Sequence, residues 1–463
     1  MEETMLKRKM LTTLKQWNEK GANRAFMLIG ARQTGKTYII REFARECFDA
    51  LAEVNLYEDE NAKKTLSAAQ DTADFIARLS LITQMDVSVR NTLLFIDEIQ
   101  EAPDILTMVK FLVETGRQRV VVSGSMLGTE FKGFRSFPVG YVETHRMYPL
   151  DFEEFCWAQN VPQEIIDDVR EAYASRHDLD DGLHNRLMQT YKYHIAVGGM
   201  PASVSAFVEG ANNLTVTREV NAGIVEDYRY DISKYASKRS LLIQGIFDSI
   251  PSQLDKQNKR FRLDSIKNGA IFDRYEDDFV WIIDAGVALP AYCVSEPKKP
   301  LARTAQKNKF KLYESDTGLL LSQYEPSVTT DVVVGESKTN FGSVYENSVA
   351  QELACQIPEL YYYYSSKNGE VDFLVTQNDG RVLPVEVKSG KDYKLHTSLN
   401  TLLGSDEYGI SEAVVLSMAN VSQSYRQGKP LWYLPLYMSF CIAESANGKM
   451  PETHLPIMDF SDY

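Results

Sequence analysis

An eight-residue run near the N-terminus has the composition of a loop that binds phosphate groups. Residues 30–37 read Gly-Ala-Arg-Gln-Thr-Gly-Lys-Thr and directly follow the apolar run at 25–29. Glycines at the first and sixth positions let backbone N–H groups surround an anion, the lysine reaches the terminal phosphates, and the last hydroxyl can ligate Mg²⁺. A plain glycine turn between strand and helix is the alternative, but the flanking elements favour a bound nucleoside triphosphate. We therefore assign the whole loop to the nucleotide: Gly30, Ala31, Arg32, Gln33, Thr34, Gly35, Lys36 and Thr37.

Two adjacent carboxylates end a later apolar run. Asp97 and Glu98 follow Leu93-Leu94-Phe95-Ile96, about sixty residues after the loop. Open α/β sheets place their ligands at the carboxyl ends of their strands, so Asp97 can join Thr37 in holding Mg²⁺, and Glu98 can act as the general base toward water. The next strand ends in Ser123-Gly124-Ser125, where the Ser125 hydroxyl could sense the γ-phosphate. A solvated strand end and an ordinary turn are the respective alternatives.

The identity of the nucleotide base and the class of reaction can be inferred from the other motifs that the chain contains or lacks. The chain contains no Asn-Lys-x-Asp motif of the kind that reads guanine, so the sequence favours ATP over GTP. A small-molecule kinase is the competing class, but such kinases rarely carry an adjacent Asp-Glu pair on a later strand. The cofactors predicted from sequence are ATP and Mg²⁺, and the predicted reaction is hydrolysis of ATP to ADP and phosphate.

A second set of acidic residues lies far from the first. Gly369-Glu-Val-Asp372 is followed by Glu386-Val-Lys388. Side chains alternate along a strand, so Glu386 and Lys388 share one face, and a hairpin through 377–380 would bring Asp372 beside Glu386. Two carboxylates sharing a Mg²⁺, with Lys388 acidifying a water, can cleave a phosphodiester. The pattern resembles the active site of the PD-(D/E)xK nucleases, in which Glu346 on the preceding helix would be an additional metal ligand. The alternative without a catalytic role is a half-exposed strand of alternating charges. Folds of the nuclease kind also serve as binding modules.

Strands and helices must position these residues. Strands at 25–29, 51–56, 92–96 and 119–123 alternate with helices, which predicts a parallel α/β sheet. An amphipathic helix is expected at 4–20, and helices dominate 151–250. The predicted domains are 1–210 (ATPase with a helical extension), 211–335 (helical and winged-helix-like) and 336–463 (nuclease-like α/β). Basic residues at 256–262 and 298–311 make DNA a candidate partner, against the alternative of a structural lid on the ATPase.

Composition limits the remaining choices. The 463-residue chain has a formal net charge of −14, which argues against a general nucleic-acid coat. Its five Cys are odd in number and lack metal-ligand spacing, which favours a reduced cytoplasm. No apolar run approaches the length of a membrane span, so no membrane partner is expected. An oligomer is compatible with these features.

The motifs together resemble a bacterial and archaeal group of AAA+-type ATPases. The resemblance rests on the phosphate loop, Leu94-Phe-Ile-Asp-Glu-Ile-Gln100, Ser123-Gly-Ser125, the run at 148–155 and Gly198-Gly-Met-Pro201. In that group the ATPase is fused to an uncharacterised C-terminal domain with a restriction-endonuclease-like core. The resemblance implies a nucleotide switch that controls a nuclease-like, DNA-interacting domain. The alternative is a switch whose C-terminal domain is catalytically inactive and binds a protein or DNA.

One departure from the resemblance concerns an arginine. Many relatives carry Arg after the glycine that precedes Pro-Leu-x-Phe, whereas this chain reads Gly140-Tyr141-Val142. An arginine that completes the site must then come from elsewhere. The candidates are Arg32, Arg135, Arg146 and Arg229.

Overall fold

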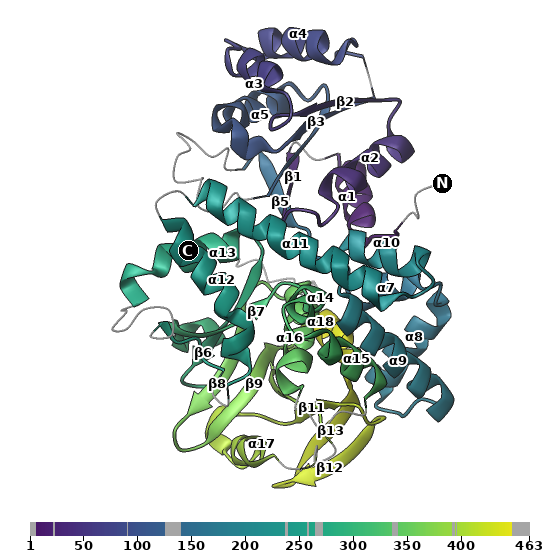
Figure 1. Ribbon diagram of the computed structural model, residues 1–463, viewed down its shortest axis with the longest axis vertical. Helices are drawn as coiled ribbons and strands as arrows, with labels where there is room; N and C mark the ends of the chain where they lie inside the picture. Colours follow the sequence, from purple (N-terminus) through teal and green to yellow (C-terminus); the bar gives the residue numbers. More distant parts are fainter. Residues whose placement is uncertain are drawn as a thin grey trace, which may run out of the picture.

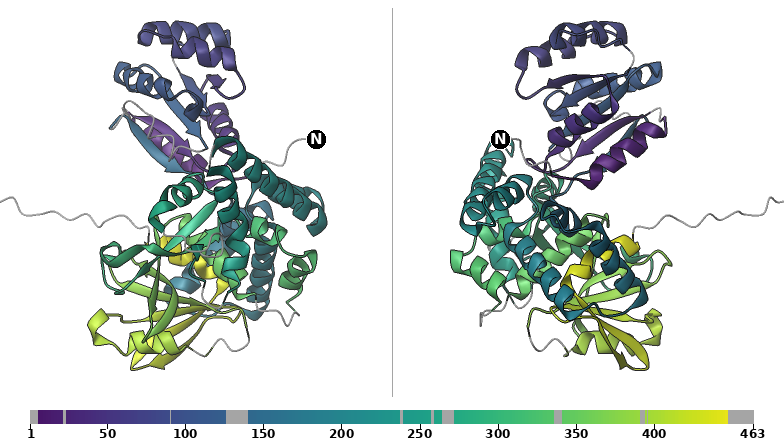
Figure 2. Two further views of the ribbon diagram at one scale, coloured as in Figure 1. Left: turned by 60° about the vertical axis from the view of Figure 1, so that its left-hand side comes forward. Right: turned by 90° about the vertical axis from the view of Figure 1, so that its right-hand side faces the viewer.

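The computed structural model describes residues 6–21, 24–89, 91–125, 140–236, 239–256, 259–263, 272–335, 341–390, 394 and 396–446. Within these residues the chain forms two sheets, one at each end of the molecule, with a layer of helices between them (Figure 1). Two further views show that the N-terminal sheet and its helices stand apart from the larger lower part, and that α11 lies between them (Figure 2).

The N-terminal sheet is parallel, with strand order β2-β3-β4-β1-β5. Helices cover both faces of the sheet, and β3 is accordingly apolar from Leu93 to Ile96 and buried along its whole length. The four strands expected before residue 125 are confirmed to within one residue. The carboxyl ends of all five strands meet at one edge. The elements are α1 (Lys9–Glu19), β1 (Ala25–Ile29), α2 (Lys36–Cys47), β2 (Ala50–Asn55), α3 (Glu60–Ser67), α4 (Thr72–Thr83), β3 (Thr92–Asp97), α5 (Pro103–Thr115), β4 (Arg119–Gly124) and β5 (Val142–Arg146).

Helices form the middle of the molecule, as the sequence predicts. A capping box at Asp151 and Glu154 begins the first of them. The longest, α11, contacts α9, α10, α12 and α14, and it crosses beneath the N-terminal sheet (Figure 1). The helices are α7 (Phe152–Ala158), α8 (Gln163–Ser175), α9 (Asp181–Val197), α10 (Pro201–Glu209), α11 (Leu214–Tyr235), α12 (Ser240–Leu254), α13 (Glu276–Asp284), α14 (Thr317–Ser322) and α15 (Pro326–Val334).

The second sheet has eight strands in the order β12-β13-β11-β10-β9-β8-β6-β7. The expected hairpin is confirmed, since β9 and β10 pair antiparallel with Val385 opposite Phe373. One helix of this part, α16, contacts β7 and β10 of the sheet. The elements are β6 (Ala288–Val294), β7 (Ala305–Glu314), α16 (Gly342–Ala354), β8 (Leu360–Ser365), β9 (Gly369–Thr376), β10 (Val382–Val387), α17 (Thr397–Leu403), β11 (Ala413–Ser417), β12 (Ser422–Arg426), β13 (Lys429–Pro435) and α18 (Ser439–Ala446).

The strands β6 and β7, which lie in the region predicted to be winged-helix-like, belong to this large sheet. β6 pairs antiparallel with β7 on one side and parallel with β8 on the other, so the sheet continues across residue 335. The physical reason is the apolar sequence of β6, five of whose seven residues are buried and which therefore needs neighbours on both edges. The division of the chain at 210 and 335 stays a prediction. No helix among the described residues is both long enough and apolar enough to cross a membrane.

Candidate functional site

The loop at 30–37 joins β1 to α2 and bends sharply at its two glycines. Gly30 has φ 152° and Gly35 has φ 90°. A Cβ on Gly30 would lie 2.3 Å from the carbonyl oxygen of Met147, so a side chain does not fit there. The Lys36 ammonium is buried and donates to the carbonyls of Gly30 (3.0 Å) and Ala31 (2.8 Å). Burial lowers the pKa of Lys36, and an anion beside it would relieve that cost.

Thr37 and Asp97 come together at the carboxyl edge of the sheet. The Thr37 hydroxyl donates to Asp97 Oδ2 at 2.7 Å. The other Asp97 oxygen accepts the backbone N–H of Glu98 (3.0 Å) and the hydroxyl of Ser123. Asp97 is 1% exposed, so these contacts hold the carboxylate in one orientation. A hydroxyl and a carboxylate are oxygen ligands that Mg²⁺ accepts, and the two residues fit the predicted ion.

Glu98 follows directly and has an unusual backbone. Its φ of 54° and ψ of 48° lie in the left-handed region, which non-glycine residues rarely adopt and which is often found at functional sites. Glu98 Oε2 accepts the Ser125 hydroxyl at 3.1 Å and also the Gln100 amide. Ser125, expected at the nucleotide, thus contacts the predicted general base itself. Gln100 was not predicted, although its place in Asp-Glu-Ile-Gln is visible in the sequence.

The C-terminal carboxylates surround a lysine that the sequence did not single out. Lys311 of β7 is fully buried, and its Nζ lies 2.8 Å from Glu346, 2.7 Å from Glu370 and 3.5 Å from Asp372. Burial alone would lower the pKa of Lys311, but Glu346 and the other acidic neighbours raise it well above its usual value. Glu346 also accepts the ammonium of Lys259. Burial would raise the pKa of Glu346, yet the two lysines lower it to about 2.

This arrangement differs from the predicted metal site of Glu346, Asp372 and Glu386. Among the described residues no group of three or more His, Cys, Asp or Glu side chains is placed to hold a metal ion. Glu346 and Asp372 face the Lys311 ammonium, which supplies the positive charge that a cation would bring. Glu386 instead pairs with the predicted catalytic Lys388, at 2.5 Å. The described residues therefore do not fit a bound divalent ion at this point.

Three family models match consecutive parts of the chain. A model described as an AAA domain matches residues 22–156, which contain the loop, Asp97 and Glu98. The N-terminal part of this chain is an AAA-type P-loop ATPase domain. Two domains of unknown function follow, DUF8612 at 188–326 and DUF4143 at 341–437. Neither name gives an activity, so a restriction-endonuclease-like core stays a prediction.

Solved structures resemble the chain at low identity. A Walker-type ATPase of Pyrococcus abyssi is 13% identical with a TM-score of 0.44, over 70% of this chain and 97% of that one. Cdc6p of Pyrobaculum aerophilum is 11% identical with a TM-score of 0.26, over 72% of this chain and 95% of that one. No curated protein matches. The assignment of the ATPase domain therefore rests on the family model and on the geometry above.

A cavity of about 360 Å³ opens beside the loop of the ATPase domain. It lies between the segment before α1, the start of α2 and one face of α10. Two hydrogen bonds of Gly199 fix the chain just before α10. The Gly199 N–H donates to Asp316 at 2.5 Å, and the Gly199 carbonyl accepts the Leu150 N–H at 2.6 Å. A Cβ on Gly198 would lie 2.0 Å from an Asp316 oxygen and one on Gly199 2.1 Å from the Leu150 carbonyl oxygen, so a side chain fits at neither glycine of the Gly-Gly-Met-Pro motif. The lining residues are Leu6, Arg8, Gly35, Tyr38, Pro201, Ala202, Ser205 and Glu209.

The four candidate arginines have different surroundings. Arg32 of the loop pairs with Asp231 of α11 at 2.6 Å. Arg229 pairs with Asp248 of α12 at 2.8 Å and with Glu226. Arg146 ends β5 and lines a cavity of about 200 Å³ together with Gly30. Arg135 lies outside the described residues.

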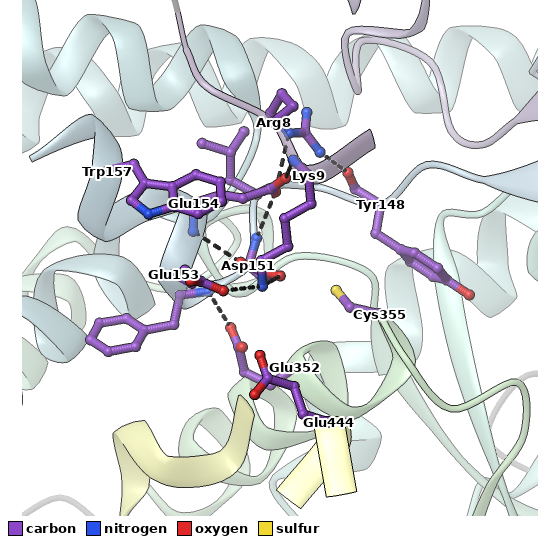
Figure 3. Close-up of polar contacts among 12 residues, drawn as sticks. Arg8, Lys9, Tyr148, Asp151, Glu153, Glu154, Trp157, Glu352, Cys355 and Glu444 are labelled. Atoms are coloured by element: carbon purple, nitrogen blue, oxygen red, sulfur yellow. Dashed lines mark hydrogen bonds and ion pairs between the residues drawn. The ribbon is translucent and has the colours of Figure 1, made fainter. Parts of the chain in front are cut away.

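A buried polar network joins the ATPase domain to the rest of the chain (Figure 3). Arg8 donates to the carbonyls of Thr34 in the loop (2.9 Å) and Tyr148 (2.7 Å), and pairs with Glu154 of α7 (3.1 Å). Lys9 pairs with Asp151 (2.6 Å) at the start of the same helix. Since both cations come from the N-terminal segment, that segment ties the phosphate loop to α7.

The network continues into the C-terminal part through Glu352 of α16. Glu352 Oε1 accepts the backbone N–H of Phe152, the first residue of α7, at 2.9 Å. The Nδ1 of His194 lies 3.6 Å from the same oxygen. Burial lowers the pKa of His194 to about 4, so the imidazole is neutral there. One helix end therefore contacts the nucleotide loop through Arg8 and the C-terminal part through Glu352.

Glu352→Gln should make the protein less sensitive to rising pH. Burial, reinforced by Asp151, raises the pKa of Glu352 well above its ordinary value, so the folded protein keeps a proton that the unfolded chain releases. The stability that this proton confers is present below pH 4.5 and is lost as pH rises through the folded pKa. Glutamine mimics the protonated acid and does not titrate. The free energy of urea unfolding of the variant, relative to wild type, should thus increase between pH 5 and 8. Glu171→Gln, at an exposed position, is the matched control. If the difference in unfolding free energy between Glu352→Gln and wild type stayed the same across this pH range, the prediction would be contradicted.

Proposed function

We propose that this protein is an ATP-binding, ATP-hydrolysing and Mg²⁺-dependent molecular switch whose nucleotide state acts on its C-terminal domain. The observation that carries the proposal is the meeting of Lys36, Thr37, Asp97 and Glu98 at one edge of the sheet. These residues come from two segments about sixty positions apart, and each has the chemistry that its expected role needs. A cytoplasmic location stays a prediction.

Two features support nucleotide binding: the groups of the loop that favour phosphates, and a neighbouring cavity for the base and ribose. Backbone N–H groups, Lys36 and the N-terminus of α2 favour the phosphates. The neighbouring cavity of about 360 Å³, walled by Leu6, Tyr38 and Pro201, suits the base and ribose. Gly35 belongs to both the loop and the cavity, so a single nucleotide can occupy the two at once.

Hydrolysis is assigned to the chain's own groups. Glu98 takes the proton of the attacking water, and the contacts from Gln100 and Ser125 hold its carboxylate in place. Lys36 stabilises the charge on the terminal phosphate oxygens. Mg²⁺, when bound at Thr37 and Asp97, would neutralise phosphate charge.

For the C-terminal domain we favour the binding module over the nuclease. The support is the buried Lys311, which already compensates the carboxylates of Glu346, Glu370 and Asp372. DNA as the bound partner stays a prediction. The basic stretch that suggested it is in part turned inward, since Lys259 and Lys311 both contact Glu346.

Two assays on the purified full-length protein test this proposal. We expect it to release inorganic phosphate from ATP in the presence of Mg²⁺ without any acceptor. Phosphate transfer to an added small molecule, without release to water, would instead indicate a kinase. With Mg²⁺ or Mn²⁺ we expect no cleavage of DNA or RNA. Cleavage by wild type that is lost in Asp372→Ala and Lys388→Ala would overturn the binding-module assignment.

A further inference from the structure

Helix α11 covers the tip of the phosphate loop with two carboxylates. Arg32 Nη1 lies 2.6 Å from Asp231 Oδ1, and Gln33 Nε2 donates to Asp227 Oδ2 at 2.7 Å. Between these two contacts, the Tyr228 hydroxyl donates to the Arg32 carbonyl at 3.1 Å. Asp231 lies four positions after Asp227 and three after Tyr228, so the three side chains lie on one side of the helix. That face holds the part of the loop that the sequence assigns to phosphate.

The Arg32–Asp231 pair lies within electrostatic reach of the groups that act on ATP. Burial raises the pKa of Asp231, and the negative charge of Glu98 contributes to the rise. Lys36, whose pKa burial lowers, also senses the positive charge of Arg32. The side chains of Arg32 and Asp231 are 23% and 11% exposed, so water screens their charges incompletely.

A triphosphate at this loop and the carboxylate of Asp231 would compete for the same guanidinium. Arginine offers a planar fork of N–H donors that matches a carboxylate and a phosphate equally well. A bound nucleotide adds several negative charges next to Asp227 and Asp231, which repel them. Releasing Arg32 from Asp231 both relieves this repulsion and frees a cation for the γ-phosphate.

We propose that Arg32 is the arginine that completes this ATPase site in cis, and that Asp231 restrains it until the γ-phosphate displaces the carboxylate. The proposal rests on the proposed ATPase function. It makes α11 the element that reports the γ-phosphate, because its contact with the loop is weakened when Arg32 turns to the nucleotide.

The opposite end of α11 contacts the helices through which a change at the loop would reach the C-terminal domain. Arg218 donates to the carbonyls of Leu321 (2.5 Å), Ser322 (3.0 Å) and Tyr324 at the end of α14, and to the hydroxyl of Thr329 in α15 at 3.1 Å. Helix α14 in turn packs against α16 of the C-terminal domain. In Figure 1, α11 runs from beneath the N-terminal sheet to these helices. A displacement at the loop is thereby linked to the C-terminal part of the chain.

The test compares a γ-phosphate analogue with ADP in the full-length protein. Asp231→Asn should bind AMP-PNP more tightly by about 5- to 150-fold, the range of typical coupling between sites, while ADP affinity changes much less. The ratio of the two affinities within one variant is insensitive to a general loss of folded protein. Arg32→Met should lower kcat by about a thousandfold or more, as expected for an arginine on the transferred phosphate. In the double variant the gain from Asp231→Asn should disappear.

Glu226→Gln, on the same helix and paired with Arg229, is the matched control and should leave the affinity ratio unchanged. The inference would be overturned if Asp231→Asn left the ratio of AMP-PNP to ADP affinity unchanged. It would also be overturned if the tighter AMP-PNP binding persisted in the double variant that lacks Arg32. Full activity of Arg32→Met would overturn it as well. Failure of wild type to hydrolyse ATP is a different outcome, since it overturns the proposed function itself.

Discussion

Glu98→Gln should bind ATP with near-normal affinity and hydrolyse it about one hundred to ten thousand times more slowly than wild type. This is the usual contribution of a positioned general base. Glutamine keeps the size of the side chain and an oxygen that can accept the Ser125 hydroxyl, so the strained backbone at residue 98 has no new steric reason to move. Phosphate release measures kcat, and equilibrium binding of ATP separates binding from chemistry.

The matched control for this variant is Glu101→Gln. Glu101 lies three residues further along, and its side chain pairs with Lys63 at 3.2 Å. A partly exposed ion pair of this kind contributes little to stability, and the Glu101 side chain has no assigned role in the chemistry, so the variant should change kcat by less than about twofold. If Glu98→Gln turned over ATP as fast as this control, Glu98 would not be the base.

Lys311→Met should lower the free energy of unfolding by about 3–5 kcal/mol, the cost of removing one partner from a buried set of charges. The methionine occupies a similar volume, so the loss reflects charge rather than a cavity. Glu346 and Glu370 would both lose a cation at less than 3 Å. Urea unfolding of the full-length protein measures the change.

Two further variants separate charge from packing at this position. Lys307 lies on β7 four residues before Lys311 but is exposed, and Lys307→Met should change stability by no more than about 0.5 kcal/mol. Adding Glu370→Gln to Lys311→Met should recover part of the loss, because the Glu370 carboxylate loses the Lys311 ammonium that it contacts. If Lys311→Met were as stable as Lys307→Met, the lysine would not compensate these carboxylates.

The ATPase domain could be predicted from sequence because its signals are local. The loop, Asp97 and Glu98 each follow an apolar strand directly, and parallel pairing then brings strand ends together without further information. The hairpin that places Asp372 near Glu386 was predictable for the same reason, since one short turn connects its strands. These predictions needed only the neighbours of each residue in the chain.

The interactions that could not be predicted join residues far apart in sequence. Lys311 is 61 positions from Asp372, and it belongs to the basic stretch at 298–311 that the sequence offers as a DNA contact. Arg8 and Lys9 were expected inside an amphipathic helix at 4–20, yet α1 begins at Lys9. Carboxylates about 145 residues away pair with both side chains. Helical periodicity carries no information on such partners. The pairing of β6 with β8 was missed because strands 60 or more residues apart leave no local signal.

Hydrogen exchange on the Glu98→Gln protein, in ATP and then in ADP, tests the central claim most directly. That claim is that the nucleotide state of the loop reaches the C-terminal domain. The account predicts that amide protection will differ between the two nucleotides in the loop, at the start of α7 near Phe152, and in α16, where Glu352 accepts the Phe152 N–H. A difference confined to residues 30–37, with identical exchange in α7 and α16, would contradict it.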